Sequence, residues 1–213
     1  MLDINNIAFT FLNYPMSWLE ILGTVTGLAS VILAARAKAS NYPVGLINIF
    51  FFIVLFYQVQ LYSDMILQFV FAVISVIGFI KWVRPKSNEA NIKHQLKISW
   101  MKPKDYGIAA VSIIAGTAIL GTFMSHIHEF FPVLLPAAYP YPDSFVMAMS
   151  VAAMILMAKK KVESWICWII VDVVCVFLFY FKGIMLMSVE YGIFLGIATY
   201  GLVIFIKQFK KGL

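Results

Sequence analysis

The chain has 213 residues, of which 62% are hydrophobic and only 12% carry a charge. Its mean hydropathy is +0.92, whereas soluble domains contain about 45–50% apolar and about 25% charged residues. One core of this size cannot bury so much apolar surface, so a soluble enzyme and a disordered protein are both excluded. The composition predicts an integral membrane protein without a separate soluble domain.

Seven apolar stretches are long enough, or nearly so, to cross about 30 Å of hydrocarbon. We expect every span to be an α-helix, because lipid cannot satisfy exposed backbone groups. The apolar runs are continuous rather than alternating, which disfavours a β-barrel. The predicted spans are 17–35, 43–60, 62–83, 106–125, 143–158, 164–181 and 184–206.

The connections between these spans differ in charge. With alternating crossings, one side holds 15 of the 16 Lys and Arg residues, and the other side holds only Lys182. The positive-inside rule then places the N-terminus outside and the C-terminal tail in the cytoplasm. The net charge of +6 is therefore interpreted as a topology signal, and we expect no nucleic-acid partner.

Two segments of the chain resemble each other. The sequence VILAARAK at 31–38 is followed, at an offset of 123, by MILMAKKK at 154–161. The first three spans therefore match the last three, and the fourth span connects two units that run in the same direction, as in parallel-repeat transporters. The predicted organisation is a first three-helix repeat at 17–83, a loop, connector helix and outer loop at 84–142, and a second repeat at 143–206.

Asp172 is the clearest polar residue inside a predicted span. An ionisable residue there marks a function by default, because its insertion costs roughly 2.5–3.5 kcal/mol. Trp165, Trp168 and Asp172 are spaced to share one helix face. Two alternatives stay open: Trp165 as a residue of the interfacial aromatic belt, and Asp172 as the partner in a structural interhelical hydrogen bond.

Polar residues in other spans complete the predicted site. Asn41 and Asn48 lie on one face of the second span, and sliding the repeat offset by one residue places them on Trp165 and Asp172. Gln68 and Glu190 form a second related pair, so a site between the repeats is predicted. Asn48 and Gln68 are alternatively explained as polar contacts that join helices. Small-residue motifs at Gly23/Gly27 and Gly192/Gly196 predict close helix contacts.

Sequence motifs for catalysis are absent. The chain has no phosphate-binding G-x-x-x-x-G-K-[ST] loop, no H-E-x-x-H and no G-x-S-x-G. We therefore expect no enzyme, no ATP-driven motor, no metal site and no cofactor.

The residues around these sites resemble the Pnu-type vitamin transporters. SNYPVGLIN at 40–48 and YQVQLY at 57–62, which includes Tyr57, are similar to the first half of that family. VESWICWIIVD at 162–172 and MSVEY at 187–191 are similar to the second half. The resemblance implies seven helices in a SWEET-like 3+1+3 arrangement, a homotrimer in the lipid of a bacterial inner membrane, and facilitated diffusion of a vitamin that is then trapped by phosphorylation.

The resemblance also bears on the substrate. The family's nicotinamide riboside transporters have the motif W-x-x-W-x-x-x-N, whereas this chain has Asp172 at the last position. An ionised carboxylate only accepts hydrogen bonds and adds a negative charge, which favours thiamine with its N–H donors and cationic ring. We therefore expect thiamine, with nicotinamide riboside as the alternative and riboflavin third. The expected substrate-binding residues are Trp165, Trp168, Asp172, Asn48, Gln68, Glu190, Asn41 and Tyr57.

Overall fold

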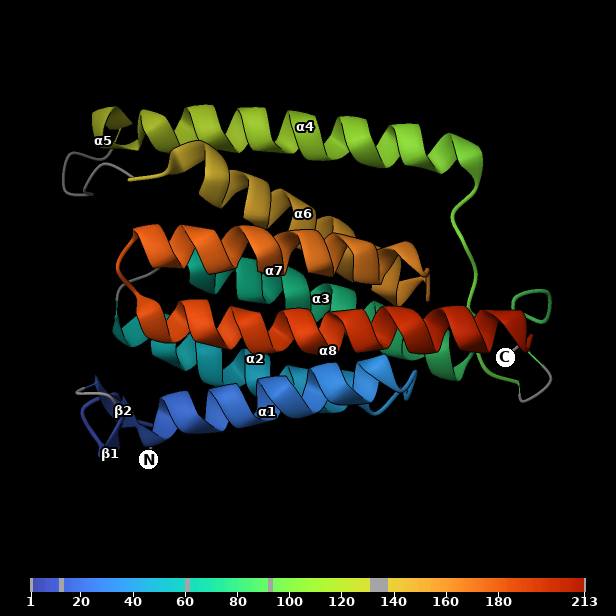
Figure 1. Ribbon diagram of the computed structural model, residues 1–213, viewed down its shortest axis with the longest axis horizontal. Coiled ribbons are helices and arrows are strands. Elements are labelled where there is room, and N and C mark those ends of the chain that lie inside the picture. The colour runs from blue at the N-terminus through green and yellow to red at the C-terminus, as the bar shows by residue number, and fades with distance from the viewer. Residues whose placement is uncertain (1, 12–13, 60–61, 92–93, 131–137, 213) are drawn as a thin grey trace. The chain divides into compact units, whose positions relative to one another are not determined.

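The computed structural model describes residues 2–11, 14–59, 62–91, 94–130 and 138–212. Within these residues, seven helices are long and apolar enough to cross a membrane, which confirms the predicted all-α membrane fold (Figure 1). They are α1 (Trp18–Ala35), α2 (Asn41–Gln58), α3 (Tyr62–Val83), α4 (Pro103–Ser125), α6 (Pro140–Ala158), α7 (Glu163–Phe181) and α8 (Met185–Lys210), and the short α5 (Ile127–Phe130) follows α4.

The helix boundaries extend beyond the apolar runs. The helix α4 begins at Pro103 and α6 begins at Pro140, three residues before the predicted spans in each case. Proline is favoured in the first helical turn, because its fixed φ suits the helix and its missing N–H is not needed there. The helix α8 continues to Lys210, where basic side chains suit the C-terminal end of the helix dipole.

A capping box fixes the start of α1. Ser17 accepts a hydrogen bond at 3.2 Å from the backbone N–H of Glu20, whose carboxylate accepts one at 2.8 Å from the backbone N–H of Ser17. The hydroxyl of Tyr14 also donates to Glu20, at 2.6 Å. The two bonds from backbone N–H groups satisfy helix N-terminal donors that otherwise have no partner.

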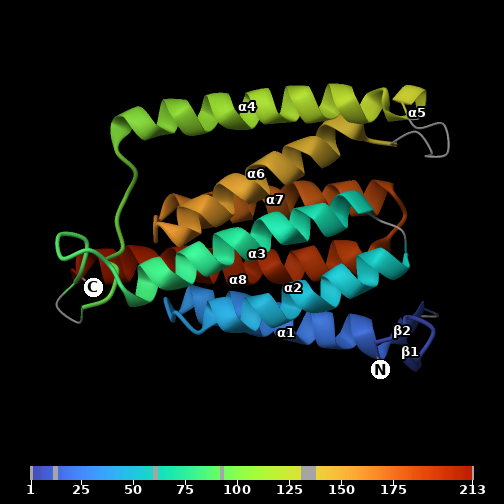
Figure 2. The same cartoon turned by 180° about the vertical axis from the view of Figure 1, so that it is seen from behind.

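The chain forms two compact units, and α8 contributes to both. The first unit comprises Met1–Lys97 with Val203–Leu213, and the second comprises Ile98–Leu202. In the first unit α2 packs between α1 and α3, as the view from behind shows (Figure 2). In the second unit α6 packs against both α4 and α7.

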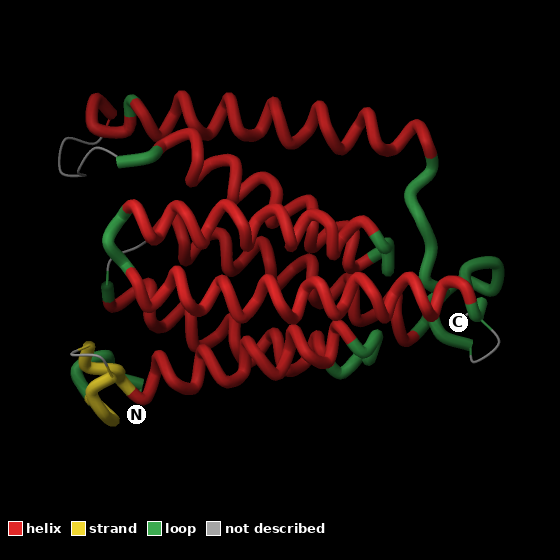
Figure 3. The backbone as a smooth tube through the Cα atoms, in the orientation of Figure 1, coloured by secondary structure: helices red, strands yellow, loops and turns green. Residues whose placement is uncertain are grey.

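A β-hairpin precedes α1, which the sequence analysis did not predict. Its strands are β1 (Ile7–Phe11) and β2 (Tyr14–Ser17), which pair in antiparallel fashion (Figure 3). The side chain of Gln58, at the end of α2, accepts from the backbone N–H of Ile4 at 2.8 Å and donates to the carbonyl of Leu2 at 2.6 Å. The N-terminal segment is thereby attached to the first unit.

Candidate substrate site

Three residues of the predicted site lie on α7, in the second unit. The side chain of Trp165 is 1% exposed and that of Asp172 is 4% exposed, while Trp168 is half-buried. Their spacing along the helix places them on one face, as predicted. Because Trp165 is enclosed by protein, the alternative of a belt residue at the membrane surface is disfavoured.

The ring of Trp165 lies directly against the backbone of α8. A Cβ atom added to Gly201 would come within 2.7 Å of the Trp165 ring, much closer than side chains pack. Only a glycine leaves room for the indole at this position. The sequence analysis did not identify Gly201, although the repeat offset relates it to another glycine, Gly78.

Asp172 lies beside an apolar cluster and has no partner among the residues that the structure describes. Met149, Val171 and Cys175 form the buried centre of this cluster, and Trp168, among others, packs against it. Within the described residues, the Asp172 carboxylate forms no hydrogen bond or ion pair. The structural interhelical hydrogen bond considered above is therefore not observed, and both carboxylate oxygens are free to accept from a ligand.

Glu190 lies on α8 in the same unit and is half-buried. Its neighbour Tyr191 stacks on Phe179 of α7, with ring centroids 5.3 Å apart and an interplanar angle of 12°. Phe179 and Tyr191 both pack against the apolar cluster beside Asp172. The sequence analysis missed this aromatic pair, because aromatic residues are common throughout the predicted spans.

The first unit holds the other four predicted residues, and two of them have structural roles there. The amide of Asn48 donates to the carbonyl of Gly23 at 2.7 Å, and a Cβ on Gly27 would meet the same amide at 3.0 Å. Asn48 therefore joins α2 to the small-residue face of α1, as its alternative interpretation predicted. Asn41 is 5% exposed and donates to the carbonyl of Lys38 at 2.7 Å.

The remaining two residues of the first unit have no such bonding role within the described chain. Gln68 lies half-buried on α3, and Tyr57 lies near the end of α2 with 65% of its surface exposed. The structure thus groups Trp165, Trp168, Asp172 and Glu190 in one unit, and Asn41, Asn48, Tyr57 and Gln68 in the other.

The turns before α2 and α7 have matching geometry at the repeat offset. Ala37 and Lys160 both adopt a left-handed backbone, with φ of 55° and 53°. Asn41 donates to the carbonyl of Lys38 three residues before it, and Ser164 donates in the same way to Lys161, both at 2.7 Å. Non-glycine residues rarely adopt positive φ, so the coincidence supports the internal repeat.

The helices that follow these turns also match. In the first unit a Cβ on Gly78 would lie 2.6 Å from the ring of Tyr42, just as Gly201 accommodates Trp165 in the second. Tyr42 and Trp165, and likewise Gly78 and Gly201, are 123 residues apart. Asn41 therefore corresponds to Ser164, and the register shifted by one residue, which paired Asn41 with Trp165, is wrong at this turn.

Glu163 is a buried acid that the sequence analysis missed. It is 5% exposed and accepts hydrogen bonds from the backbone N–H of Met101, at 2.8 Å, and from the hydroxyl of Tyr106. The segment before α4 is also held by the side chain of Lys161, which donates to Ser99 at 2.8 Å. These bonds fix the start of α7 two residues before Trp165. Its position in the first turn of a predicted helix, where an acid suits the helix dipole, could have identified Glu163 from the sequence.

The comparison with known proteins identifies the family. The family model described as "Nicotinamide mononucleotide transporter" matches residues 17–207. The chain belongs to this family. Its members are transporters, and the chain is a multi-pass protein of the bacterial inner membrane. Among the described residues, no group of three His, Cys, Asp or Glu is placed to hold a metal ion.

Individual relatives agree with the family assignment. The "Nicotinamide riboside transporter PnuC" of Escherichia coli is 37% identical over 207 residues, covering 88% of this chain and 84% of that protein. The "Riboflavin/roseoflavin transporter RibM" of Streptomyces davaonensis is 24% identical and covers 93% of this chain and 89% of its own length. The crystal structure of a "Vitamin B3 transporter PnuC" matches with a TM-score of 0.66 at 24% identity, covering 92% of this chain and 83% of that one, and it shares the fold.

Proposed function

We propose that this member of the nicotinamide mononucleotide transporter family carries nicotinamide riboside across the membrane by facilitated diffusion. The observation that carries the proposal is a buried carboxylate, Asp172, which has no protein partner within the described residues and lies on the same helix face as Trp165 and Trp168. The 37% identity to the Escherichia coli nicotinamide riboside transporter supports the choice of ligand.

The chemistry of this ligand suits these three residues. Nicotinamide riboside combines a positively charged aromatic ring with a ribose that donates hydrogen bonds through its hydroxyl groups. Indole rings attract cationic rings through their π faces, and a carboxylate accepts strong hydrogen bonds from hydroxyl donors. A neutral apolar ligand would gain nothing from Asp172.

Nicotinamide riboside replaces thiamine as the proposed substrate. The sequence favours thiamine only through Asp172, which differs from the asparagine in the motif of the riboside transporters. Similarity along most of the chain to proteins named nicotinamide riboside transporters is stronger support than this single residue. Riboflavin is the second candidate, because a relative of 24% identity is named a riboflavin transporter. Riboflavin is neutral, so it gains less from the buried carboxylate.

Three further proposals concern the assembly of the protein, its orientation in the membrane and its source of energy. We propose a homotrimer with the 3+1+3 arrangement, in line with the family resemblance. We also propose an outer N-terminus and a cytoplasmic tail, because 15 of the 16 basic residues fall on one predicted side. We propose that transport needs no ATP, because the sequence contains no motor motif. We also propose that it needs no ion gradient, in line with the family resemblance; protons carried by Asp172 and Glu190 are the alternative.

Calorimetric titration of the purified protein with the three vitamins tests the choice of ligand. Nicotinamide riboside should bind most tightly, and Trp168→Ala should weaken it roughly tenfold, since a stacked cation is worth about 0.5–2 kcal/mol. The matched control is Trp18→Ala, because Trp18 is 42% exposed at the start of α1. Tighter binding of thiamine or riboflavin, or an equal loss in both tryptophan variants, would contradict the proposal.

A further inference from the structure

The second unit holds a cation among aromatic rings where the first turn of α6 meets the C-terminal end of α7. The ammonium group of Lys182 lies 2.7 and 3.0 Å from the two carboxylate oxygens of Asp143. The same ammonium lies 5.8 Å from the ring centroid of Tyr139 and 5.6 Å from that of Phe179. We call Tyr139, Asp143 and Phe179 the cation cage.

The residues of the cation cage are those that bind organic cations in proteins. Aromatic faces attract a cation within about 6 Å of the ring centroid, and a carboxylate balances its charge. Lys182 therefore occupies the cage as a tethered cation from its own chain. Its side chain is 22% exposed and that of Asp143 is 43% exposed, so the pair is open to solvent and weakly bound.

The internal repeat shows that this pairing is particular to the second unit. Glu20 lies 123 residues before Asp143, at the start of α1. It is held by Tyr14 and Ser17, and no cation pairs with it in the described part of the chain. The position 123 residues before Lys182 is Val59. Hydrogen bonds alone therefore hold the acid at this position of the first unit, so holding Asp143 in place does not by itself require Lys182.

The cation cage also adjoins the candidate substrate site. Phe179 contributes one face to the cage and stacks on Tyr191. Phe179 and Tyr191 pack against the apolar cluster beside Asp172. A ligand that leaves the cage therefore meets aromatic side chains that border the buried carboxylate.

We propose that the cation cage is a first binding site for an organic aromatic cation, and that Lys182 fills it until such a cation displaces the ammonium. The inference rests on the proposed function, because nicotinamide riboside carries the required charged ring. The positive-inside prediction places this end of the unit outside, where a ligand arrives. Neutral ligands cannot replace the ammonium beside Asp143, so the cage selects for positive charge.

Lys182→Gln tests the proposal, because it removes the tethered cation and keeps a polar side chain. Calorimetry on the purified full chain measures the affinity for nicotinamide riboside and for 1-methylnicotinamide, a small aromatic cation used as a probe. Both affinities should rise roughly three- to tenfold, the range of one cation–π contact. Adding Tyr139→Leu or Phe179→Leu to Lys182→Gln should remove the gain. Of these two substitutions, Tyr139→Leu should disturb folding less, because Tyr139 is 37% exposed.

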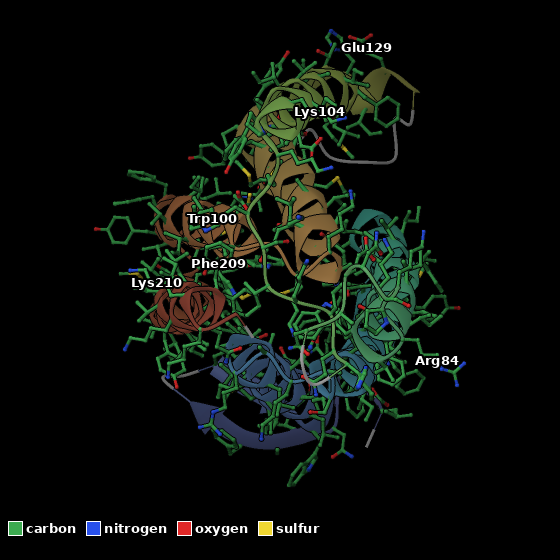
Figure 4. All side chains as sticks on the ribbon, turned by 90° about the vertical axis from the view of Figure 1, so that its right-hand side faces the viewer. Arg84, Trp100, Lys104, Glu129, Phe209 and Lys210 are labelled. Atoms are coloured by element: carbon green, nitrogen blue, oxygen red, sulfur yellow. The ribbon has the colours of Figure 1, made fainter. Side chains whose placement is uncertain are left out.

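Two controls isolate the cage. Lys104→Gln removes one positive charge from an exposed position in the first turn of α4 (Figure 4), where Lys104 forms no hydrogen bond or ion pair within the described residues. It should change neither affinity. The neutral reduced form of nicotinamide riboside, whose ring carries no charge, should bind Lys182→Gln and the wild type equally.

The outcomes separate this inference from the proposed function. Unchanged affinities in Lys182→Gln, or an equal loss for charged and neutral ligands, would make the pair an ordinary structural salt bridge and overturn the proposal. If the wild type does not bind or carry nicotinamide riboside but Lys182→Gln gains affinity for 1-methylnicotinamide, the cation cage stands and the proposed function fails.

Discussion

At the scale of single residues, Asp172 is the feature that most needs a functional explanation. A carboxylate that is 4% exposed and has no protein partner in the described chain costs free energy unless a ligand or a proton compensates it. Trp168, half-buried on the same helix face, provides the flat surface that an aromatic ligand needs, and Trp165 is packed on Gly201 beside it. The residue is therefore better explained by binding than by stability.

Substitution of Asp172 separates acceptor capacity from charge. Asp172→Asn keeps the shape and one acceptor oxygen but removes the charge that suits a cationic ring, so the affinity for nicotinamide riboside should fall less than it does in Asp172→Leu. Asp172→Leu removes both oxygens, and a hydrogen bond to a charged group is worth about 1.5–3 kcal/mol, so the affinity should fall roughly tenfold to a hundredfold. Calorimetry measures both, with Glu129→Gln, an exposed position, as the control. An equal loss in both Asp172 variants would indicate a structural residue.

Lys160 is a second buried charge, and it lies outside the membrane-spanning segments. It is 3% exposed in the turn between α6 and α7, and burial lowers its pKa from 10.5 to about 8. Because the folded state binds the proton less tightly than the unfolded state, the unfolded state holds more protons between these two values. Stability therefore rises with pH across this window and is lowest below it.

Thermal unfolding of the purified protein as a function of pH checks this direction. The melting temperature of the wild type should rise between about pH 8 and pH 10 relative to that of Lys160→Met, which has no ammonium to desolvate. Parallel curves for the two proteins would show that Lys160 is not desolvated in the folded state.

At the scale of elements, the contact between α7 and α8 depends on one missing side chain. A methyl group on Gly201 would collide with the ring of Trp165, whereas no described atom lies within 4 Å of a Cβ on Gly192 in the same helix. Gly192/Gly196 therefore makes no close contact within the described residues, although its pattern resembles that of Gly23/Gly27. The motif alone does not distinguish the two cases.

Two alanine substitutions in α8 test this contact against each other. Gly201→Ala should destabilise the protein by about 1–3 kcal/mol, the usual cost of overpacking, and should weaken ligand binding because Trp165 is displaced. Gly192→Ala should be neutral or slightly stabilising, since alanine favours the helix. Melting temperatures in detergent compare the two, and equal values would contradict the tight contact.

The sequence predicted some elements well because their signals are local. Apolar runs about 20 residues long define membrane helices directly, and the spacing from Trp165 to Asp172 defines a helix face. The hairpin before α1 was missed because its short strands carry no marked pattern beside the long apolar runs, and the bonds of Gln58 to Leu2 and Ile4 join residues far apart in the sequence. Asn48 joins α2 to Gly23 of α1, and the ring of Trp165 packs on Gly201 of α8. Both are contacts between helices, which the spacing of residues in the sequence does not reveal.

At the scale of the whole molecule, the two units share local geometry but differ in chemistry. Both contain an aromatic ring packed on a glycine and a left-handed residue in the preceding turn. Only the second unit holds the buried Asp172, the two tryptophans of α7 and the cation cage. We infer that the second unit provides the charged contacts to the ligand, while the amides Asn41 and Asn48 of the first unit are largely engaged in structure.

The measurement that tests the central claim most directly is uptake of labelled nicotinamide riboside by liposomes that contain the purified protein, without ATP or an ion gradient. We predict that the internal ligand concentration rises to that outside and stops there, that Trp168→Ala slows this uptake, and that empty liposomes show none. Uptake of thiamine or riboflavin in preference to nicotinamide riboside, or accumulation above the outside concentration only under an imposed proton gradient, would contradict the account.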